Sequence, residues 1–89
     1  MAEDGGNMKI IKMPRVSMIN KSILAFWRKK EGDRVERGES LFDIETDKAT
    51  ISARSPYTGI LTKILVKNGY SAKVGEPVAY IEEEIIHQN

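Results

Sequence analysis

Short apolar runs alternate with polar stretches that carry glycine and proline along most of the chain. Runs rich in Ile, Val and Leu between such turn residues are typical of β-strands, and helix signals are essentially absent. We expect strands at residues 9–13, 23–28, 40–45, 49–54, 60–66 and 77–82, with short pairings at 34–35 and 71–72. The pattern therefore predicts an all-β domain.

The second half of the chain repeats the first. Gly69 follows Gly32 by 37 positions, and Gly75 follows Gly38 by the same number. At this spacing the halves also match at Lys30 and Lys67, Glu39 and Glu76, Leu41 and Val78, Ile44 and Ile81, Glu45 and Glu82, Ile23 and Ile60, Leu24 and Leu61, and Trp27 and Ile64. Neither half could cover its own apolar face, so we expect pseudo-twofold packing around a shared core, closed so that strand edges are hidden.

Several glycines fall where the predicted turns favour positive φ, which glycine adopts without steric cost. They are Gly32, Gly38, Gly59, Gly69 and Gly75.

One lysine, Lys48, falls between the strands predicted at 40–45 and 49–54. Asp47 before it is a favoured turn residue, so we expect Lys48 at the exposed tip of a tight hairpin. In the repeat, Lys48 aligns with Ile11 near the start of the chain. The Lys48 turn and the two termini are therefore expected at opposite ends of the domain.

Composition narrows the functional classes. The chain has 89 residues, no cysteine and a formal net charge of +1 from 14 basic and 13 acidic residues. A domain of this size is too small for a usual catalytic cleft with a cofactor site, and its charge gives no general attraction to nucleic acid or membranes. No apolar stretch approaches the length of a membrane helix, and the acidic start lacks presequence features. We expect a soluble intracellular module, or a processed fragment, without catalytic or metal-binding residues.

Two other features receive structural interpretations. The aromatic pair 26–27 beside the basic run 28–30 has the composition of a nucleic-acid surface. The acidic residues Glu31 and Asp33 follow at once and no second basic run accompanies it, so we interpret it as a solvated strand end. Trp27 is expected in the core, and His87 in a linker.

With these features together, the chain resembles a lipoyl domain of the 2-oxo acid dehydrogenase complexes. The segments that carry the resemblance are Ile11-Lys12-Met13-Pro14, Trp27, Lys30-Glu31-Gly32-Asp33-Arg34-Val35, Gly38-Glu39, Ile44-Glu45-Thr46-Asp47-Lys48-Ala49, Ser55-Pro56, Gly59, Ile64, Gly69, Val74-Gly75-Glu76-Pro77 and Ile81-Glu82. The resemblance implies a flattened β-barrel, or sandwich, of two four-stranded antiparallel sheets. It divides the chain into a flexible segment 1–8, a lipoyl domain 9–83 and the start of a linker 84–89.

The resemblance also implies a function. Lys48 would carry lipoate as an amide, with Glu45, Thr46, Asp47 and Ala49 shaping the turn or serving recognition. The domain would itself catalyse nothing: its swinging arm would pass acyl groups and reducing equivalents between a thiamine-diphosphate-dependent decarboxylase, an acyltransferase core and a dihydrolipoyl dehydrogenase. A lipoylating enzyme would load it. The expected context is an acyltransferase component of pyruvate or acetoin type, in the cytoplasm of a prokaryote or, for a processed eukaryotic fragment, in the mitochondrial matrix.

One stretch departs from the family pattern. Many lipoyl domains have an acidic, glycine-bearing loop where this chain has Ile19, Asn20, Lys21 and Ser22. In the family this loop lies beside the lipoyl turn and helps to select the decarboxylase. We expect a shorter and less acidic partner-specificity loop here, and a local backbone difference because Ser22 stands where the repeat has Gly59.

Alternative functions remain at this point. A biotinyl carrier domain has the same fold, but methionine normally flanks its lysine on both sides, whereas Asp47 and Ala49 do so here. The lipoylated carrier of glycine cleavage is longer, with a different motif. An unmodified β-barrel adaptor or nucleic-acid-binding module is a third possibility.

Overall fold

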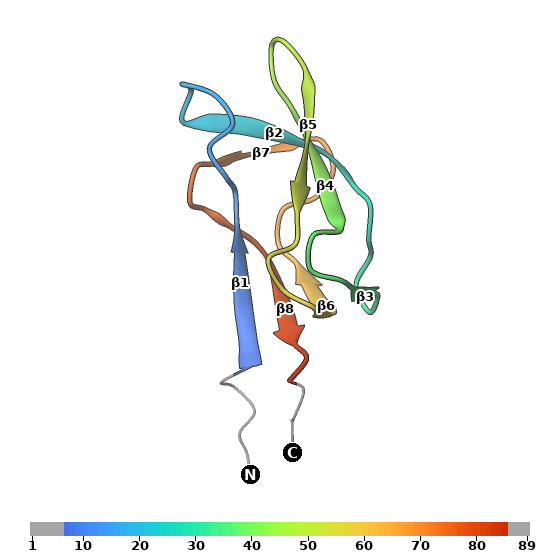
Figure 1. Ribbon diagram of the computed structural model, residues 1–89. Helices are drawn as coiled ribbons and strands as arrows, with labels where there is room; N and C mark the ends of the chain where they lie inside the picture. Colours follow the sequence, from blue (N-terminus) through green and yellow to red (C-terminus); the bar gives the residue numbers. More distant parts are fainter. Residues whose placement is uncertain (1–6, 86–89) are drawn as a thin grey trace.

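The structure, a computed structural model, describes residues 7–85, and its regular structure is formed by strands (Figure 1). Eight strands follow in order: β1 (Met8–Lys12), β2 (Lys21–Trp27), β3 (Arg34–Val35), β4 (Ser40–Glu45), β5 (Thr50–Arg54), β6 (Gly59–Ile64), β7 (Tyr70–Lys73) and β8 (Pro77–Glu83). All predicted strands are present, with ends that differ by at most two residues. Within the described part of the chain, no helix has the length and apolar character needed to span a membrane.

The strands form two four-stranded antiparallel sheets. Their orders are β1-β8-β6-β3 and β5-β4-β2-β7. Exchanging each strand for its counterpart in the other half, β1 for β5 through β4 for β8, converts one order into the other. The expected pseudo-twofold arrangement is therefore confirmed, and each sheet takes two strands from each half.

The turn glycines repeat with the strands. Gly32 and Gly69 have φ of 96° and 87°, and Gly38 and Gly75 have φ of 89° and 87°. The expectation of positive φ is confirmed at these four glycines and is wrong for Gly59. A Cβ at Gly59 would lie 2.1 Å from the Glu82 carbonyl oxygen, so glycine is required there by the close approach of β6 to β8.

The sheets do not close into a barrel, contrary to the expectation of full closure. Within residues 7–85, no ladder joins β1 to β5 or β3 to β7, and these four strands end their sheets. Packed sheets lie about 10 Å apart, roughly twice the spacing of hydrogen-bonded strands, because core side chains separate them. With two residues, β3 forms only a short ladder, with β6, and leaves its other side unpaired among the described residues. The result is a sandwich with open edges.

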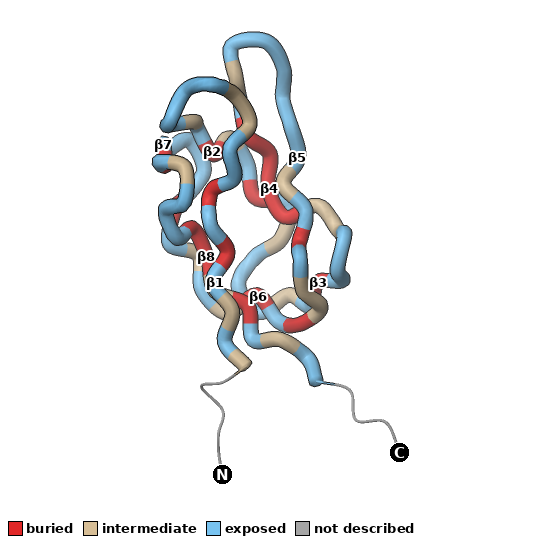
Figure 2. Tube along the Cα trace, turned by 60° about the vertical axis from the view of Figure 1, so that its left-hand side comes forward, coloured by how far each residue is buried: buried red, intermediate tan, exposed pale blue. Residues whose placement is uncertain are grey.

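The core lies between the sheets (Figure 2). Leu24, Phe42 and Ile44 of one sheet and Leu61 and Ile81 of the other are completely buried. The remaining buried apolar residues are Ile11, Met13, Trp27, Val35, Leu41, Val66, Ala72, Val78 and Ala79. Both halves contribute to this one core, as the repeat predicts.

Trp27 is part of this core, as expected. Its ring lies 4.8 Å from that of Phe42 at a tilt of 55°, a favourable aromatic arrangement. The indole Nε1–H donates to the Val66 carbonyl oxygen at 2.7 Å, which satisfies the buried polar atom.

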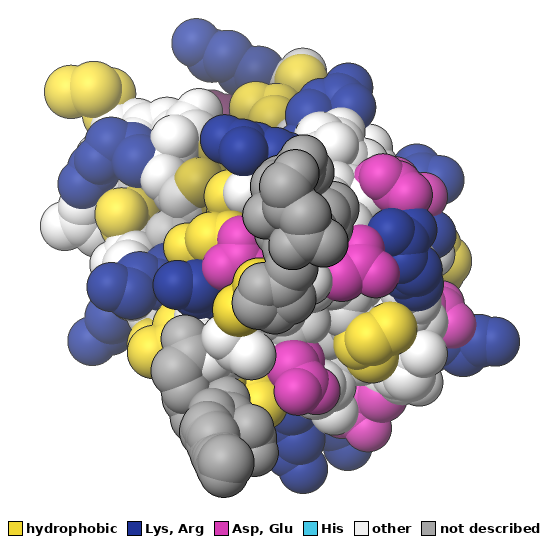
Figure 3. Space-filling view, turned by 60° about the horizontal axis from the view of Figure 1, so that its bottom comes forward, with side chains coloured by type: hydrophobic (Ala, Val, Ile, Leu, Met, Phe, Trp, Pro, Cys, Tyr) yellow, Lys and Arg dark blue, Asp and Glu magenta, His cyan; other side chains and the backbone are white. Residues whose placement is uncertain are grey.

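The β4–β5 hairpin projects from one end of the sandwich, whereas β1 begins and β8 ends at the other, which agrees with the predicted arrangement (Figure 1). The terminal end carries intermingled acidic and basic side chains (Figure 3). Arg34 there pairs with Glu36 and Glu84, and Lys9 with Glu83. These ion pairs connect the ends of β1, β3 and β8 and leave the hairpin end unobstructed.

Candidate functional site

The β4–β5 hairpin is shaped by Thr46. Its backbone N–H donates to the Ala49 carbonyl oxygen at 2.9 Å. Its hydroxyl oxygen accepts from the N–H groups of Lys48 (3.2 Å) and Ala49 (3.0 Å), and the hydroxyl donates to the Ala49 carbonyl oxygen at 2.7 Å. One side chain thus satisfies the backbone of a tight turn whose tip is Asp47 and Lys48.

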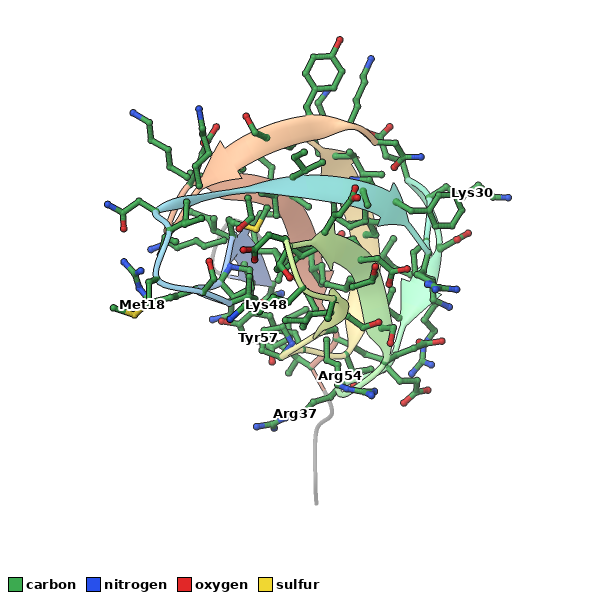
Figure 4. All side chains as sticks on the ribbon, turned by 90° about the horizontal axis from the view of Figure 1, so that it is seen from above. Met18, Lys30, Arg37, Lys48, Arg54 and Tyr57 are labelled. Atoms are coloured by element: carbon green, nitrogen blue, oxygen red, sulfur yellow. The ribbon has the colours of Figure 1, made fainter. Side chains whose placement is uncertain are left out.

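Lys48 is exposed at this tip, as predicted (Figure 4). Among the described residues, its ammonium group has neither a hydrogen-bond acceptor nor an ion-pair partner within range. A long stem that carries a primary amine beyond the rest of the fold can be acylated without displacing any packed group. These residues fit a cofactor that is joined through an amide.

The neighbours of Lys48 differ in what they contribute. Ala49 shapes the turn through its backbone, as expected. The side chain of Asp47 is exposed and makes no hydrogen bond or ion pair with the described residues, and its part in shaping the turn stays a prediction. Glu45 is exposed at the end of β4. Recognition by Glu45 and Asp47 stays a prediction.

The predicted partner-specificity stretch lies beside the hairpin, but only half of it is a loop. Lys21 and Ser22 belong to β2, where they pair with β7, which leaves Ile19 and Asn20 in the β1–β2 loop. A shallow groove of about 300 Å³ lies between this stretch and the hairpin, lined among others by Ile19 and Asp47. Strand pairing explains why the loop is shorter than predicted, because Lys21 and Ser22 pair with Lys73 and Ala72 of β7 and so belong to β2.

Sequence reasoning missed the residues that hold the β1–β2 loop. The guanidinium of Arg15 donates to the Asn20 side-chain oxygen at 2.8 Å and to the Ser17 carbonyl oxygen at 3.2 Å. The Val74 N–H donates to the Asn20 carbonyl oxygen at 2.8 Å. Met18, 94% exposed, forms the apolar apex of the loop near the Lys48 end (Figure 4). The sequence signal for this contact was the presence of Arg15 five residues before Asn20, close enough for their side chains to meet across a short loop.

A buried carboxylate supports the sheet that carries the hairpin. Asp43 of β4 is 7% exposed. It accepts from Arg28 at 2.7 Å and 3.2 Å and from the Ser52 hydroxyl at 3.0 Å. The hydrogen bond from Arg28 lowers the pKa of Asp43, burial opposes this, and Ser52 and the charge of Arg28 add to the lowering. The pair joins β4 to the end of β2 on the outer face of the sheet.

Residues 7–85 contain no group of three or more histidine, cysteine, aspartate or glutamate residues placed to hold a metal ion. His87, expected in a linker, lies outside the described residues. The exposed amine of Lys48 is therefore the main chemical feature of the hairpin end.

Comparison with known proteins agrees with this site. A family model described as biotin-requiring enzyme, covering biotin and lipoyl domains, matches residues 9–81. The acetyltransferase component of the pyruvate dehydrogenase complex of Rickettsia typhi is 45% identical over 76 residues, which is 83% of this chain and 19% of that protein. The succinyltransferase component of the 2-oxoglutarate dehydrogenase complex of Rickettsia bellii is 38% identical over 76 residues, 85% of this chain and 19% of that protein.

Two solved structures have a similar fold. The solution structure of the lipoyl domain of the 2-oxoglutarate dehydrogenase complex from Azotobacter vinelandii matches with a TM-score of 0.65 and 29% identity, over 82% of this chain and 96% of that one. A multi-domain long-chain acyl-CoA carboxylase matches in fold, with a TM-score of 0.72 and 15% identity over 94% of this chain and 8% of that one. The chain spans about a fifth of the length of the curated relatives it matches. By the family match over residues 9–81, the chain belongs to the biotinyl/lipoyl-attachment domain family.

Proposed function

We propose that this chain is a lipoyl-bearing acyl carrier of an acyltransferase component in a 2-oxo acid dehydrogenase complex, with lipoate joined to Lys48. The observation that carries the proposal is the position of Lys48, exposed at the tip of a hairpin held by Thr46, at the end opposite the termini. The names of the relatives support lipoate over biotin, since the curated ones at 38% and 45% identity are dihydrolipoyllysine acyltransferase components.

The residues of the chain act by presentation. The Thr46 hydrogen bonds hold the backbone of the turn, so the flexible side chain of Lys48 is offered to a modifying enzyme from a fixed point of the fold. Amide formation at Nζ removes the positive charge of the lysine and lengthens its flexible stem. Lipoate joined there would supply a ring disulfide that can be opened and acylated in one reductive step, with the two electrons coming from the oxidative decarboxylation of the 2-oxo acid. A flexible tether at the opposite end would keep the attached group at effective concentrations of about millimolar order near the partner enzymes.

The proposed complex is of the pyruvate type. The relatives of that type reach 43% and 45% identity, and those of the 2-oxoglutarate type 38% and 36%. The proposed partners are the thiamine-diphosphate-dependent decarboxylase, the acyltransferase core, the dihydrolipoyl dehydrogenase and the lipoylating enzyme. Contact with the decarboxylase is expected at the hairpin and the adjacent Ile19 and Asn20.

Mass spectrometry of the protein after incubation with a lipoate ligase, ATP and lipoate tests the attachment. We expect one lipoyl adduct, mapped to Lys48 by peptide sequencing, and none on Lys48→Arg, which keeps the charge and the fold. Lys12→Arg, a change of an exposed lysine at the end of β1, is the matched control and should be loaded like the unaltered protein. An adduct that persists on Lys48→Arg would contradict the assignment, and modification by a biotin ligase alone would favour a biotinyl carrier.

Reductive acylation of the loaded domain by purified decarboxylases, each with its own 2-oxo acid, tests the complex type. We expect the pyruvate decarboxylase to give the highest kcat/KM. Preference for the 2-oxoglutarate enzyme would overturn the pyruvate proposal and leave lipoylation of Lys48 intact.

A further inference from the structure

A groove of about 1180 Å³ lies between the turn after β2 and the turn before β7. Its walls come from residues 28–33 and 63–70, and the internal repeat makes Lys30 of one wall equivalent to Lys67 of the other. Trp27, 8% exposed, contributes to the groove from the core, and the ring of Tyr70 is 66% exposed beside it. The fold therefore brings Lys63 and Lys67 beside the basic run at 28–30. This proximity is not evident from the order of residues along the chain.

Much of the basic character of this groove is not neutralised. The cationic residues that line it are Arg28, Lys29, Lys30, Lys63 and Lys67. Arg28 is paired with Asp43 at 2.7 Å and Lys29 with Glu39 at 2.8 Å. The other three lysines form no ion pair with any residue in 7–85.

The two carboxylates in the groove have other partners. Glu31 accepts from the Ile64 N–H at 2.8 Å and so joins the two walls. Asp33 accepts from the Lys30 N–H at 2.9 Å and holds the first turn. Both carboxylates are therefore fixed by backbone amides, which shapes the groove and leaves the three lysine ammonium groups open to a ligand.

We propose that this groove binds an extended acidic segment of a protein partner, with Lys30, Lys63 and Lys67 contacting its carboxylates and Tyr70 its aliphatic atoms. Charge complementarity favours a peptide over nucleic acid for two reasons. The net charge of +1 gives no long-range attraction to a phosphate backbone. Glu31 and Asp33 also interrupt the cationic surface, which disfavours phosphates fixed in a backbone, whereas the flexible side chains of acidic residues in a peptide can turn away from them.

The groove is separate from the proposed attachment site. When the molecule is viewed from the hairpin end, Lys30 lies at its edge and Lys48 nearer its middle, well separated from Lys30 (Figure 4). A partner bound in the groove would leave the hairpin free, so the surface would hold the domain near a partner while Lys48 remains accessible. This inference does not depend on which group Lys48 carries.

Amide NMR spectra of the protein, titrated at low salt with a short oligo-glutamate peptide, test the proposal. We expect shifts at residues 27–33 and 63–70, a change in the fluorescence of Trp27, the one tryptophan of the chain, and weaker binding as salt is raised. Oligo-glutamine of equal length should produce none of these. An unchanged spectrum with oligo-glutamate would overturn the proposal.

Matched variants locate the interaction. The triple change Lys30→Glu, Lys63→Glu and Lys67→Glu should raise Kd about tenfold or more, since three exposed ion pairs are lost. Lys12→Glu, Arg37→Glu and Lys73→Glu change the net charge equally at exposed positions outside the groove and should leave the shifts at 27–33 and 63–70 in place. An equal loss of affinity in both triple variants would show that net charge alone causes the effect and would overturn the proposed binding in the groove.

Three further measurements complete the test. If the glutamate triple does not fold, the triple with glutamine at the same lysines carries the same expectation of weaker binding. Oligothymidylate that bound the same residues more tightly than oligo-glutamate would replace the proposal with a nucleic-acid surface. Lipoylation of Lys48 should be unchanged in the groove triple.

Discussion

Thr46 does more for the Lys48 turn than the residues that flank the lysine. Its hydroxyl serves the N–H groups of Lys48 and Ala49 and the Ala49 carbonyl oxygen at once. A threonine before a turn is a common signal for this role, but sequence alone does not distinguish it from a solvated strand end. The position of the lysine was predictable, whereas the residue that organises its turn became evident from the hydrogen bonds.

Replacing Thr46 with valine tests this role. The change keeps the shape of the side chain and removes its hydrogen bonds, so we expect a loss of about 0.5–1.5 kcal/mol in the free energy of unfolding. Faster hydrogen exchange at the Lys48 and Ala49 amides and slower lipoylation should accompany it. Thr50→Val, in which the exposed hydroxyl makes no hydrogen bond with the described residues, is the control, and equal exchange rates in both variants would refute the role of Thr46.

Gly59 gives a second prediction at this scale. In Gly59→Ala the new Cβ would meet the backbone of Glu82 at 2.1 Å, and backbone cannot move aside as a flexible side chain does. We expect a loss of about 1–3 kcal/mol, measured by urea unfolding. The repeat-equivalent Ser22 already has a Cβ, so Ser22→Ala should change stability by no more than about 0.5 kcal/mol. Similar losses in the two variants would show that close approach is not the cause.

Among the elements, the apolar pattern of β4 predicted the bounds of the strand but not the buried charge within it. Its bounds, Ser40–Glu45, agree with the sequence prediction, but Asp43 within it is buried beside Phe42 and Ile44. Alternation along the strand places Asp43 on the outer face, where it pairs in register with Ser52 and is reached by Arg28. The ion pair was not predictable, because Arg28 comes from beyond the end of a strand two elements away.

The same strand predicts a response to pH. The Arg28 hydrogen bond lowers the pKa of Asp43, so the charged carboxylate stabilises the fold above the pKa of about 3.9 in the unfolded chain, and this contribution is lost as pH falls through the lower, folded pKa. Asp43→Asn should be less stable than the unaltered protein at neutral pH, with a difference that shrinks in acid. Asp47→Asn, at the exposed turn, is the control.

Denaturant unfolding at a series of pH values measures this difference. A difference between Asp43→Asn and the unaltered protein that stayed constant into strong acid would show that the charge of Asp43 is not involved. A difference that grew in acid would reverse the sign of the proposed linkage.

Bulges are an element-scale feature that the sequence did not reveal. The pairing of β2 shifts between Leu24 and Phe26, and that of β6 shifts between Leu61 and Lys63, at equivalent places in the two halves. Each bulge inserts a residue and reverses the facing that simple alternation predicts. In β2 it allows Phe26 to face solvent while Trp27 enters the core.

At the scale of the whole molecule, the two halves are interleaved. Each sheet places two adjacent strands of one half between two single strands of the other, and the only covalent link between the halves is the β4–β5 hairpin. The hairpin that presents Lys48 is therefore also the junction of the repeat. This position explains why it projects alone from one end, while β1 begins and β8 ends at the other (Figure 1).

Interleaving predicts that neither half folds alone. Cleavage between Asp47 and Lys48 gives fragments 1–47 and 48–89, and each lacks two strands of each sheet. We expect each fragment to give an unfolded circular dichroism spectrum and the equimolar mixture to recover the β spectrum, because the long-range pairs then form between chains. A stable fold in fragment 1–47 alone would contradict this account of the core.

The sequence by itself determined the strands, the repeat, the turn glycines and the lysine at the tip, because strand periodicity and turn chemistry are local and the repeat states them twice. The tertiary structure decided which distant residues meet. Open sheet edges follow from the distance at which core side chains hold the sheets, and the basic groove follows from packing residues 28–33 beside 63–70. Such contacts join segments more than thirty positions apart, so they cannot be predicted from local sequence patterns.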